Sequence, residues 1–179
     1  MIGGPEMKKF TFQKPLSLRI KYEGLLWLRL QKRCMFVATE VGSYNADIFG
    51  INEKHGFEIE IKVSMVDFKN DFKKRKHYAY DRDGSMGISW GRRWIPNYFY
   101  FAVPTHMVEP VIAFLNDRSQ FSHNRGPCEK YGVIGVGEGV WTFAKRAQKL
   151  HDHPPDTRMK AQMALRMGSE LIRFHEAWL

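Results

Sequence analysis

The stretch G-F-E-I-E-I-K, from Gly56 to Lys62, decides the fold that this chain can adopt. Apolar side chains alternate with two glutamates and a lysine, and this period of two predicts a β-strand with one apolar and one charged face. A solvated edge strand would show the same alternation, so the stretch alone leaves both interpretations open. A second strand is predicted upstream, from Ala46 to Ile51, and the intervening residues Asn52 to Gly56 have the composition of a hairpin turn. The hairpin brings one acid, Asp47, beside an acid-x-lysine motif.

The length of the turn determines which side chains of this hairpin share a face. With a four-residue loop, Asn52 to His55, Asp47 lies directly opposite Glu60, and residues directly opposite each other point to the same side of the sheet. A loop longer by one residue would place Asp47 opposite Ile61, on the other side. A metal shared by the two acids requires the shorter loop, which we therefore expect.

The composition indicates one globular domain with a basic surface. The chain has 179 residues, of which 44% are hydrophobic and 14% aromatic, enough for one sizeable core. Its formal net charge of +9 predicts a polyanionic partner, nucleic acid first and an anionic membrane surface second. No apolar run approaches the ~18 residues of a membrane-spanning helix. Cys34 and Cys128 are far apart and outside any C-x-x-C motif, so we expect reduced thiols in a cytoplasmic or nucleoid-associated protein.

The pattern of apolar residues and breakers divides the chain into three parts. Residues 1–14 are expected to be a flexible lead, 15–150 the domain, and 151–179 a helix packed on the domain or at the interface of a homodimer. The elements expected within 15–179 are helices at Leu16–Arg33, Val66–His77, Thr105–Leu115 and Thr157–Leu179, strands at Cys34–Val41, Ala46–Ile51, Phe57–Ser64, Asn97–Val103, Tyr131–Val136 and Gly139–Phe143, and a long loop at Tyr78–Pro96.

Basic side chains follow the central strand. In the helix Val66–His77, Phe68 and Phe72 are four residues apart and are expected to face the core, with the lysines and arginine facing out. Such a cluster suits nucleic acid, but it also suits the negative end of the helix dipole. In the loop Tyr78–Pro96, arginines alternate with tryptophans, which suits phosphate contact and base stacking, or tryptophans that simply cover apolar surface. The candidate nucleic-acid-binding residues are Lys73, Lys74, Arg75, Lys76, Arg82, Arg92 and Arg93.

The hairpin carries the donors that Mg²⁺ prefers. Asp47 and Glu60 would supply carboxylates and Ile61 a backbone carbonyl, while the ion keeps several waters, and Mn²⁺ could substitute. A bound cation acidifies water and neutralises charge on a scissile phosphate. Lys62 is two residues after Glu60, hence on the same face, where its ammonium could orient the attacking water or stabilise the phosphorane oxygens.

Further acids are candidates for a supporting role. Glu40, at the end of the strand Cys34–Val41, is the first candidate and Glu23 the second. Glu58 is the third, since it shares the face of Glu60 but is expected to point to solvent near the turn. His151 and His153 could also bind a metal, but no acid or cysteine at useful spacing joins them, so a surface pair is expected.

The order helix, three strands, helix, strand, together with Asp47 and the motif Glu60-Ile61-Lys62, resembles the PD-(D/E)XK nuclease superfamily. The run E-I-K-V-S-M-V-D-F-K-N-D-F-K-K-R-K-H, with N-Y-F-Y-F-A-V-P and Y-G-V-I-G-V, is similar to its MmcB-like DNA repair branch and phage-borne relatives. The resemblance covers roughly residues 16–150. It departs from the family in having N-A-D in place of P-D, and in a longer loop at Tyr78–Pro96.

This resemblance implies a mixed α/β sheet of the restriction-endonuclease-like αβββαβ core with an extra C-terminal helix. It also implies a Mg²⁺-dependent nuclease that hydrolyses DNA phosphodiesters in repair, recombination or phage DNA processing, with Asp47, Glu60, Lys62 and Glu40 as catalytic residues. The alternative is a DNA-binding module that keeps the fold and cuts nothing. A membrane-surface protein is disfavoured, because no predicted helix joins a basic face to exposed tryptophan or phenylalanine.

Overall fold

The protein is built on one six-stranded mixed sheet with the order β1-β2-β3-β4-β5-β6. The computed structural model describes residues 16–41, 45–86, 95–117, 128–137 and 140–176, without the side chains of 81–86 and 173–176. β1 to β3 form an antiparallel meander, β3 to β5 run parallel, and β6 is antiparallel to β5. The strands are β1 (Phe36–Val41), β2 (Ala46–Ile51), β3 (Gly56–Ile61), β4 (Tyr98–Pro104), β5 (Gly132–Val136) and β6 (Trp141–Lys145).

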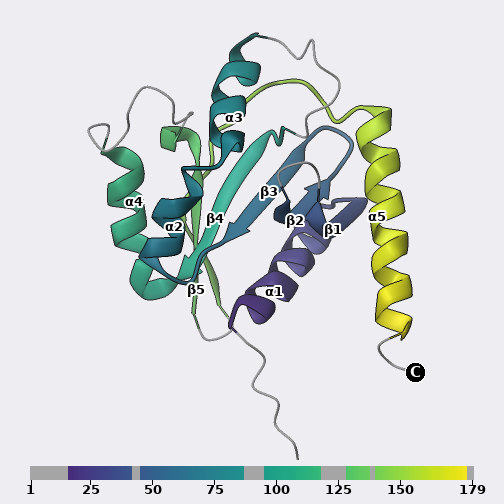
Figure 1. Ribbon diagram of the computed structural model, residues 1–179, viewed down its shortest axis with the longest axis horizontal. Helices are drawn as coiled ribbons and strands as arrows, with labels where there is room; N and C mark the ends of the chain where they lie inside the picture. The colour runs from purple at the N-terminus through teal and green to yellow at the C-terminus, as the bar shows by residue number, and fades with distance from the viewer. Residues whose placement is uncertain (1–15, 42–44, 87–94, 118–127, 138–139, 177–179) are drawn as a thin grey trace, which may run out of the picture.

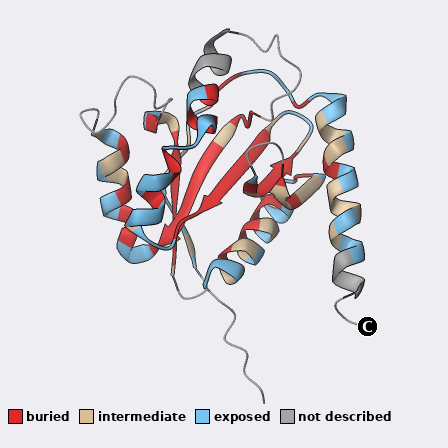
Figure 2. Cartoon of the chain, viewed as in Figure 1, coloured by how far each residue is buried: buried red, intermediate tan, exposed pale blue. Residues whose placement is uncertain are grey.

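Helices cover both faces of this sheet (Figure 1). On one face α1 (Leu16–Leu30) packs Ile20, Trp27 and Leu28 against apolar side chains of β2 to β5. On the other face lie α2 (Met65–Asp71), α3 (Arg75–Met86) and α4 (Val108–Asn116). Figure 2 shows that β3 and β4, at the centre of the sheet, are almost entirely buried. β3 is therefore a central strand and the edge-strand interpretation is wrong.

The hairpin has the register that a shared metal requires. Ile51 pairs with Gly56 and Ile48 with Ile59, so the loop is the four residues 52–55 and Asp47 lies level with Glu60. The side chain of Asn52 closes the turn by accepting hydrogen bonds from two backbone N–H groups of the loop, at 3.0 and 2.8 Å. The expected register is confirmed.

The predicted helix Val66–His77 is two helices. Ser64 caps α2 by accepting a hydrogen bond from the N–H of Asp67. α2 ends at Asp71, a tight turn at 72–74 follows, and α3 then runs to Met86. The long loop expected at 78–96 is therefore wrong for 78–86, while 87–94 lie outside the described residues. Phe68 and Phe72 pack in the core as predicted, with Phe101 and Phe114.

α5 (Thr157–Glu176) begins at the predicted position and packs on the domain at β1. Asp156 caps it by accepting a hydrogen bond from the N–H of Met159 at 2.7 Å. Met163 is fully buried against β1 and β2. The Glu170 carboxylate accepts a hydrogen bond from the N–H of Thr39 at 2.8 Å, and Arg166 donates one to the carbonyl of Thr39 at 2.9 Å. Side chains of α5 therefore satisfy backbone groups at the edge of β1. A homodimer through this helix stays a prediction.

The segment before α5 is tied to the sheet through Asn97, which is 1% exposed. Its Oδ1 accepts the N–H of Gly56 at 2.7 Å, and its Nδ2 donates to the carbonyls of His151 and His153, both at 2.9 Å. The His151 ring is itself buried, 3.2 Å from the carbonyl of Ile95. The expectation of a surface histidine pair is therefore wrong for His151.

The remaining predicted elements are close to those observed. A 3₁₀ turn, Thr105–Met107, precedes α4, and β5 and β6 occupy the last two predicted strands with small shifts at their ends. Cys34 and Cys128 are both buried, and neither is in a disulfide within the described residues. Within the ranges that the structure describes, no helix is long and apolar enough to span a membrane. The expected N-terminal lead, 1–14, lies outside those ranges.

Candidate active site

The two acids of the hairpin lie side by side, Asp47 at the start of β2 and Glu60 at the end of β3. Asp47 accepts a hydrogen bond from the N–H of Ile61 at 2.8 Å, so its carboxylate is held against the backbone that carries the candidate carbonyl ligand. Burial raises the pKa of Asp47, and the negative charge of Glu60 raises it further. The structure thus brings together the predicted ligand set, with two carboxylates that repel each other when both are ionised.

Glu60 is enclosed by lysines. Its Oε2 lies 3.2 Å from the Nζ of Lys62 and 3.5 Å from that of Lys74, and its Oε1 contacts the Nζ of Lys76. Glu60 is 1% exposed and Lys76 is not exposed at all. The expectation that Lys76 faces outward and binds nucleic acid is therefore wrong. No spacing in the sequence indicates this, because the chain turns at 72–74 and Lys76 lies in α3 rather than in the helix that carries Phe68.

Asp71, at the end of α2, binds the same lysines. Its Oδ1 lies 2.7 Å from the Nζ of Lys62 and 2.6 Å from that of Lys74, and its Oδ2 lies 3.7 Å from Lys76. Burial alone would raise the pKa of Asp71, but the contact with His77 and the lysine charges hold it well below its usual range. We call Glu58, Glu60, Asp71, Lys62 and Lys76 the buried ion cluster.

Charge in this cluster is stabilised mutually rather than by water. Burial lowers the pKa of Lys62, but the carboxylates of Glu60 and Asp71 outweigh burial and the net pKa is raised. The same opposition, with Glu58 and Glu60 as the main partners, raises the pKa of Lys76. Both lysines are therefore cationic at neutral pH, and Lys62 presents a fixed positive charge beside Glu60.

Glu58 has a different environment from the one predicted. It is 1% exposed rather than directed to solvent, and its Oε1 lies 3.1 Å from the Nζ of Lys76. Its Oε2 accepts a hydrogen bond from the Tyr80 hydroxyl, with the two oxygens 2.5 Å apart. Burial raises the pKa of Glu58 to about 7 despite the opposing charge of Lys76. This carboxyl therefore titrates near neutral pH inside the sheet–helix interface.

His77 extends the cluster toward the core, and no sequence pattern had singled it out. Its Nε2 lies 2.8 Å from Asp71 Oδ2 and its Nδ1 lies 3.0 Å from the hydroxyl of Tyr131. Burial lowers the pKa of His77 although Asp71 opposes the shift, so the ring is neutral at pH 7. His77 orients Asp71, which in turn binds Lys62.

The supporting acids proposed from the sequence lie in two different places. Glu40 lies in β1 between two residues that pair with β2, so it is level with Asp47, and its φ is 51°. Its carboxylate forms an ion pair with Lys21 of α1. The Lys21 charge also acts on Asp47, so Glu40 is linked to the site through that lysine. Glu23 instead binds the indole N–H of Trp141 at 2.6 Å and pairs with Arg19, on the α1 face. It does not join Glu60.

The predicted basic surface is described in part. Lys73, Lys74 and Arg75 are exposed at the turn between α2 and α3, as expected. Arg82 lies within α3, but its side chain is outside the described residues, as are Arg92 and Arg93 entirely. Lys74 belongs both to this surface and to the site, because it is 45% exposed and contacts Glu60 and Asp71.

Asp47, Glu60 and the Ile61 carbonyl are the kinds of donor that a hard cation with several waters would take, but both carboxylate oxygens of Glu60 contact lysines. Across the described ranges there is no group of three or more His, Cys, Asp and Glu side chains that could hold a metal ion. Two carboxylates and a backbone carbonyl would not enclose Ca²⁺ or Zn²⁺, but Mg²⁺ is commonly bound by one or two carboxylates together with waters and substrate phosphate. The repulsion between Asp47 and Glu60 is the kind that such a cation relieves.

Comparison with known proteins adds little to this geometry. Neither protein-family models nor curated proteins match the sequence. Among solved structures, the chain is similar to the SPO1766 protein of unknown function from Silicibacter pomeroyi, with 12% identity, a TM-score of 0.49 and 86% of each chain covered.

Proposed function

We propose that this protein is a Mg²⁺-dependent nuclease that hydrolyses DNA phosphodiesters, with a site of the PD-(D/E)XK type. The observation that carries the proposal is the register of the hairpin, which puts Asp47 level with Glu60 and places Lys62 on the same face. The order α1, β1, β2, β3, two helices, β4 supports it, since it is the order expected of a restriction-endonuclease-like core. A role in repair, recombination or phage DNA processing is part of the same proposal.

Each residue has a distinct task in this proposal. Asp47, Glu60 and the carbonyl of Ile61 would hold the ion, which supplies an acidified water and a positive charge for the scissile phosphate. Lys62 is kept charged by Glu60 and Asp71, so its ammonium can bind a phosphate oxygen or the attacking water. Asp71 and His77 position Lys62 from behind. Glu40 holds Lys21 near Asp47 and so adjusts the charge beside the first carboxylate.

The exposed basic residues suit the approach of DNA. Lys73, Lys74 and Arg75 lie at the turn that leads into α3, directly beside the acids that Lys74 contacts. A phosphate backbone lying over this turn would offer Lys74 a second partner. Because Lys74 is half exposed, its exchange from Glu60 to phosphate needs no rearrangement of the core.

One observation favours the alternative, a DNA-binding module that does not cut. Both carboxylate oxygens of Glu60 already contact lysines, and Lys76 is too deeply buried to leave. In that case the buried ion cluster would serve only to hold β3 against α2 and α3. The two proposals differ in what the Asp47 carboxylate does, and this difference is measurable.

The test compares cutting and binding in the same variants. Wild type is incubated with Mg²⁺ or Mn²⁺ and with linear, circular, single-stranded and branched DNA. Asp47→Asn should abolish cutting and leave DNA binding unchanged or tighter, because one negative charge near the phosphates is lost. Lys62→Ala should slow cutting on the order of 10²-fold, as the loss of a preorganised charge does. Asp152→Asn, a change at a 91% exposed carboxylate, is the matched control and should cut normally.

Binding has its own readout. Lys73→Ala should reduce DNA affinity about equally for all sequences and lower the slope of log K against log salt by roughly one, as expected for a single phosphate contact. If wild type cuts none of these DNAs with either metal while Lys73→Ala still reduces the slope, the non-catalytic module is the correct function. If the slope is unchanged as well, DNA is not the partner of this surface.

A further inference from the structure

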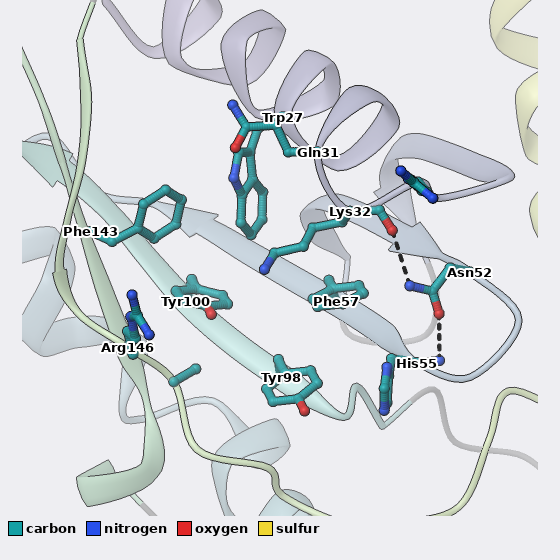
Figure 3. A pocket seen from close by; sticks show the side chains of 12 residues that line it. Trp27, Gln31, Lys32, Asn52, His55, Phe57, Tyr98, Tyr100, Phe143 and Arg146 are labelled. Carbon is teal, nitrogen blue, oxygen red and sulfur yellow. Dashed lines mark hydrogen bonds between the residues drawn. The ribbon is translucent and has the colours of Figure 1, made fainter.

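A cavity of about 650 Å³ lies on the α1 face of the sheet, where neither the hairpin acids nor Lys62 point. It is enclosed by the C-terminal end of α1, the β2–β3 turn, β4, and the end of β6 with the residues that follow it (Figure 3). This volume falls within the ~300–1,000 Å³ of sites for small molecules. The candidate active site makes no use of it, because side chains alternate along β3 and Phe57 faces away from Glu58 and Glu60.

Aromatic rings form the floor and one wall of the cavity. The rings of Phe57 and Tyr98, which are paired residues of β3 and β4, stack with centroids 5.3 Å apart and planes 14° apart. Trp27 stands edge-on to Phe57 and Tyr100, at 6.4 and 5.7 Å. Tyr98 is half-buried, so part of this stacked pair is open. We call Phe57, Tyr98, Tyr100 and Trp27 the aromatic floor.

A glycine makes room for this floor. A Cβ atom on Gly132 of β5 would overlap the ring of Tyr100, and it would lie 2.8 Å from the backbone nitrogen of Ala147. The N–H of Ala147 also binds the Tyr100 hydroxyl. Gly132 therefore leaves the space that the Tyr100 ring and the backbone of Ala147 occupy.

Cations surround the opening. Lys32, Arg33 and Arg146 line the cavity, and we call them the basic rim. The Nζ of Lys32 lies 4.9 Å from the Trp27 ring centroid and 5.8 Å from that of Phe57, so it projects over the floor. None of the twelve described residues that line the cavity is acidic. His55 is at the rim too, and burial together with Lys149 lowers its pKa, so it is neutral at pH 7.

These charges distinguish between two kinds of ligand. A cage of aromatic rings can hold a quaternary ammonium, but a cationic ligand here would meet three fixed positive charges with no acid to offset them. A flat ring that carries a phosphate satisfies both halves of the site: the ring stacks on the aromatic floor and the phosphate binds arginine and lysine. We propose that this cavity binds a nucleotide unit, with its base on the aromatic floor and its phosphate at the basic rim.

The nucleotide could be a free monophosphate or one unit of a single strand, and calorimetry with three small ligands and one oligonucleotide separates the two. The proposal predicts that deoxyadenosine monophosphate binds at least tenfold more tightly than deoxyadenosine or inorganic phosphate alone. A short single-stranded oligodeoxyadenylate that binds much more tightly than the monophosphate identifies a strand as the source; equal affinity identifies the free nucleotide. Absence of binding by both would overturn the proposal.

Variants locate the ligand. Tyr98→Ala should weaken binding about tenfold, since base–aromatic stacking is worth ~1–3 kcal/mol. Tyr98→Phe keeps the ring and should bind like wild type. Arg146→Ala should weaken the monophosphate but not deoxyadenosine, whereas Lys73→Ala, on the other face, should change neither. Calorimetry without a divalent metal measures no cutting, which makes this test independent of the proposed nuclease. Equal losses in Tyr98→Phe and Tyr98→Ala, or none in either, would refute the assignment.

Discussion

Replacing Lys76 with methionine tests whether the buried ion cluster is a unit. Methionine keeps most of the length of the side chain and removes the ammonium, which leaves Glu58, Glu60 and Asp71 without the cation that contacts all three. Removing one partner of a buried ion pair typically costs ~3–5 kcal/mol, since a desolvated charge is left uncompensated. No discount for solvent applies, because Lys76 is fully buried. In a protein of this size such a loss lowers Tm by roughly 6–20 °C.

Lys74→Met is the matched control for this change. Lys74 contacts Glu60 and Asp71 as well, but it is 45% exposed, so water replaces much of what it contributes. We expect a loss below ~1 kcal/mol, as for other exposed pairs. Urea unfolding at pH 7, followed by circular dichroism and by tryptophan fluorescence, gives both free energies of unfolding.

A double substitution makes the reasoning stricter. With Glu60→Gln added to Lys76→Met, both partners of the Lys76–Glu60 ion pair are removed, and the double variant should be more stable than the sum of the two single losses indicates. A Lys76→Met protein as stable as the Lys74→Met protein, or a double variant whose losses simply add, would show that the carboxylates do not depend on Lys76.

The other predictions concern pH and a buried amide. The pKa of Glu58 is about 7 in the folded protein, whereas in the unfolded chain the carboxyl loses its proton near its ordinary pKa. The contribution of Glu58 to the free energy of unfolding is therefore fully present below pH ~4.5 and is lost as the pH rises to about 7. The Glu58→Gln variant should therefore become more stable relative to wild type as the pH rises across that interval, and Glu53→Gln, at an exposed site, should not. A difference in unfolding free energy between Glu58→Gln and wild type that does not change with pH would contradict the raised pKa of Glu58. Asn97→Ala should cost roughly 3 kcal/mol, because the N–H of Gly56 and two carbonyls lose a buried partner. Asn116 is exposed, so Asn116→Ala should lower the free energy of unfolding only slightly. Equal melting temperatures for the Asn97→Ala and Asn116→Ala proteins would contradict the role given to Asn97.

The hairpin could be predicted from the sequence because its signals are local. The alternation in β3 and the glycine at position 56 act within a few residues, and together with the turn they determine that Asp47 and Glu60 share a face. The apolar spacing of Phe68 and Phe72 likewise places α2 on the core.

The errors lie where tertiary contacts decide. Lysine is seldom fully buried, so Lys76 was assigned to the surface, and only three converging carboxylates explain its position. Glu58 was expected in solvent because alternation does not say whether the charged face of a strand is covered. α3 was not predicted, since Gly84 and a run of polar residues weaken the helix pattern that packing at Tyr80 restores. The cavity on the α1 face joins α1, β4 and β6, which no local pattern relates.

The hydrogen bonds that Arg166 and Glu170 form with Thr39 have a consequence for how the protein contacts its own copies. An outermost strand invites another chain to extend the sheet, and this is a common beginning of aggregation. Here α5 binds the N–H and the carbonyl of Thr39 in that strand and buries its own Met163 against β1 and β2. Detachment of α5 would expose the unpaired backbone edge of β1 together with the apolar surface on which Met163 packs. While α5 is in place, its side chains hinder the pairing of β1 with a strand of another copy.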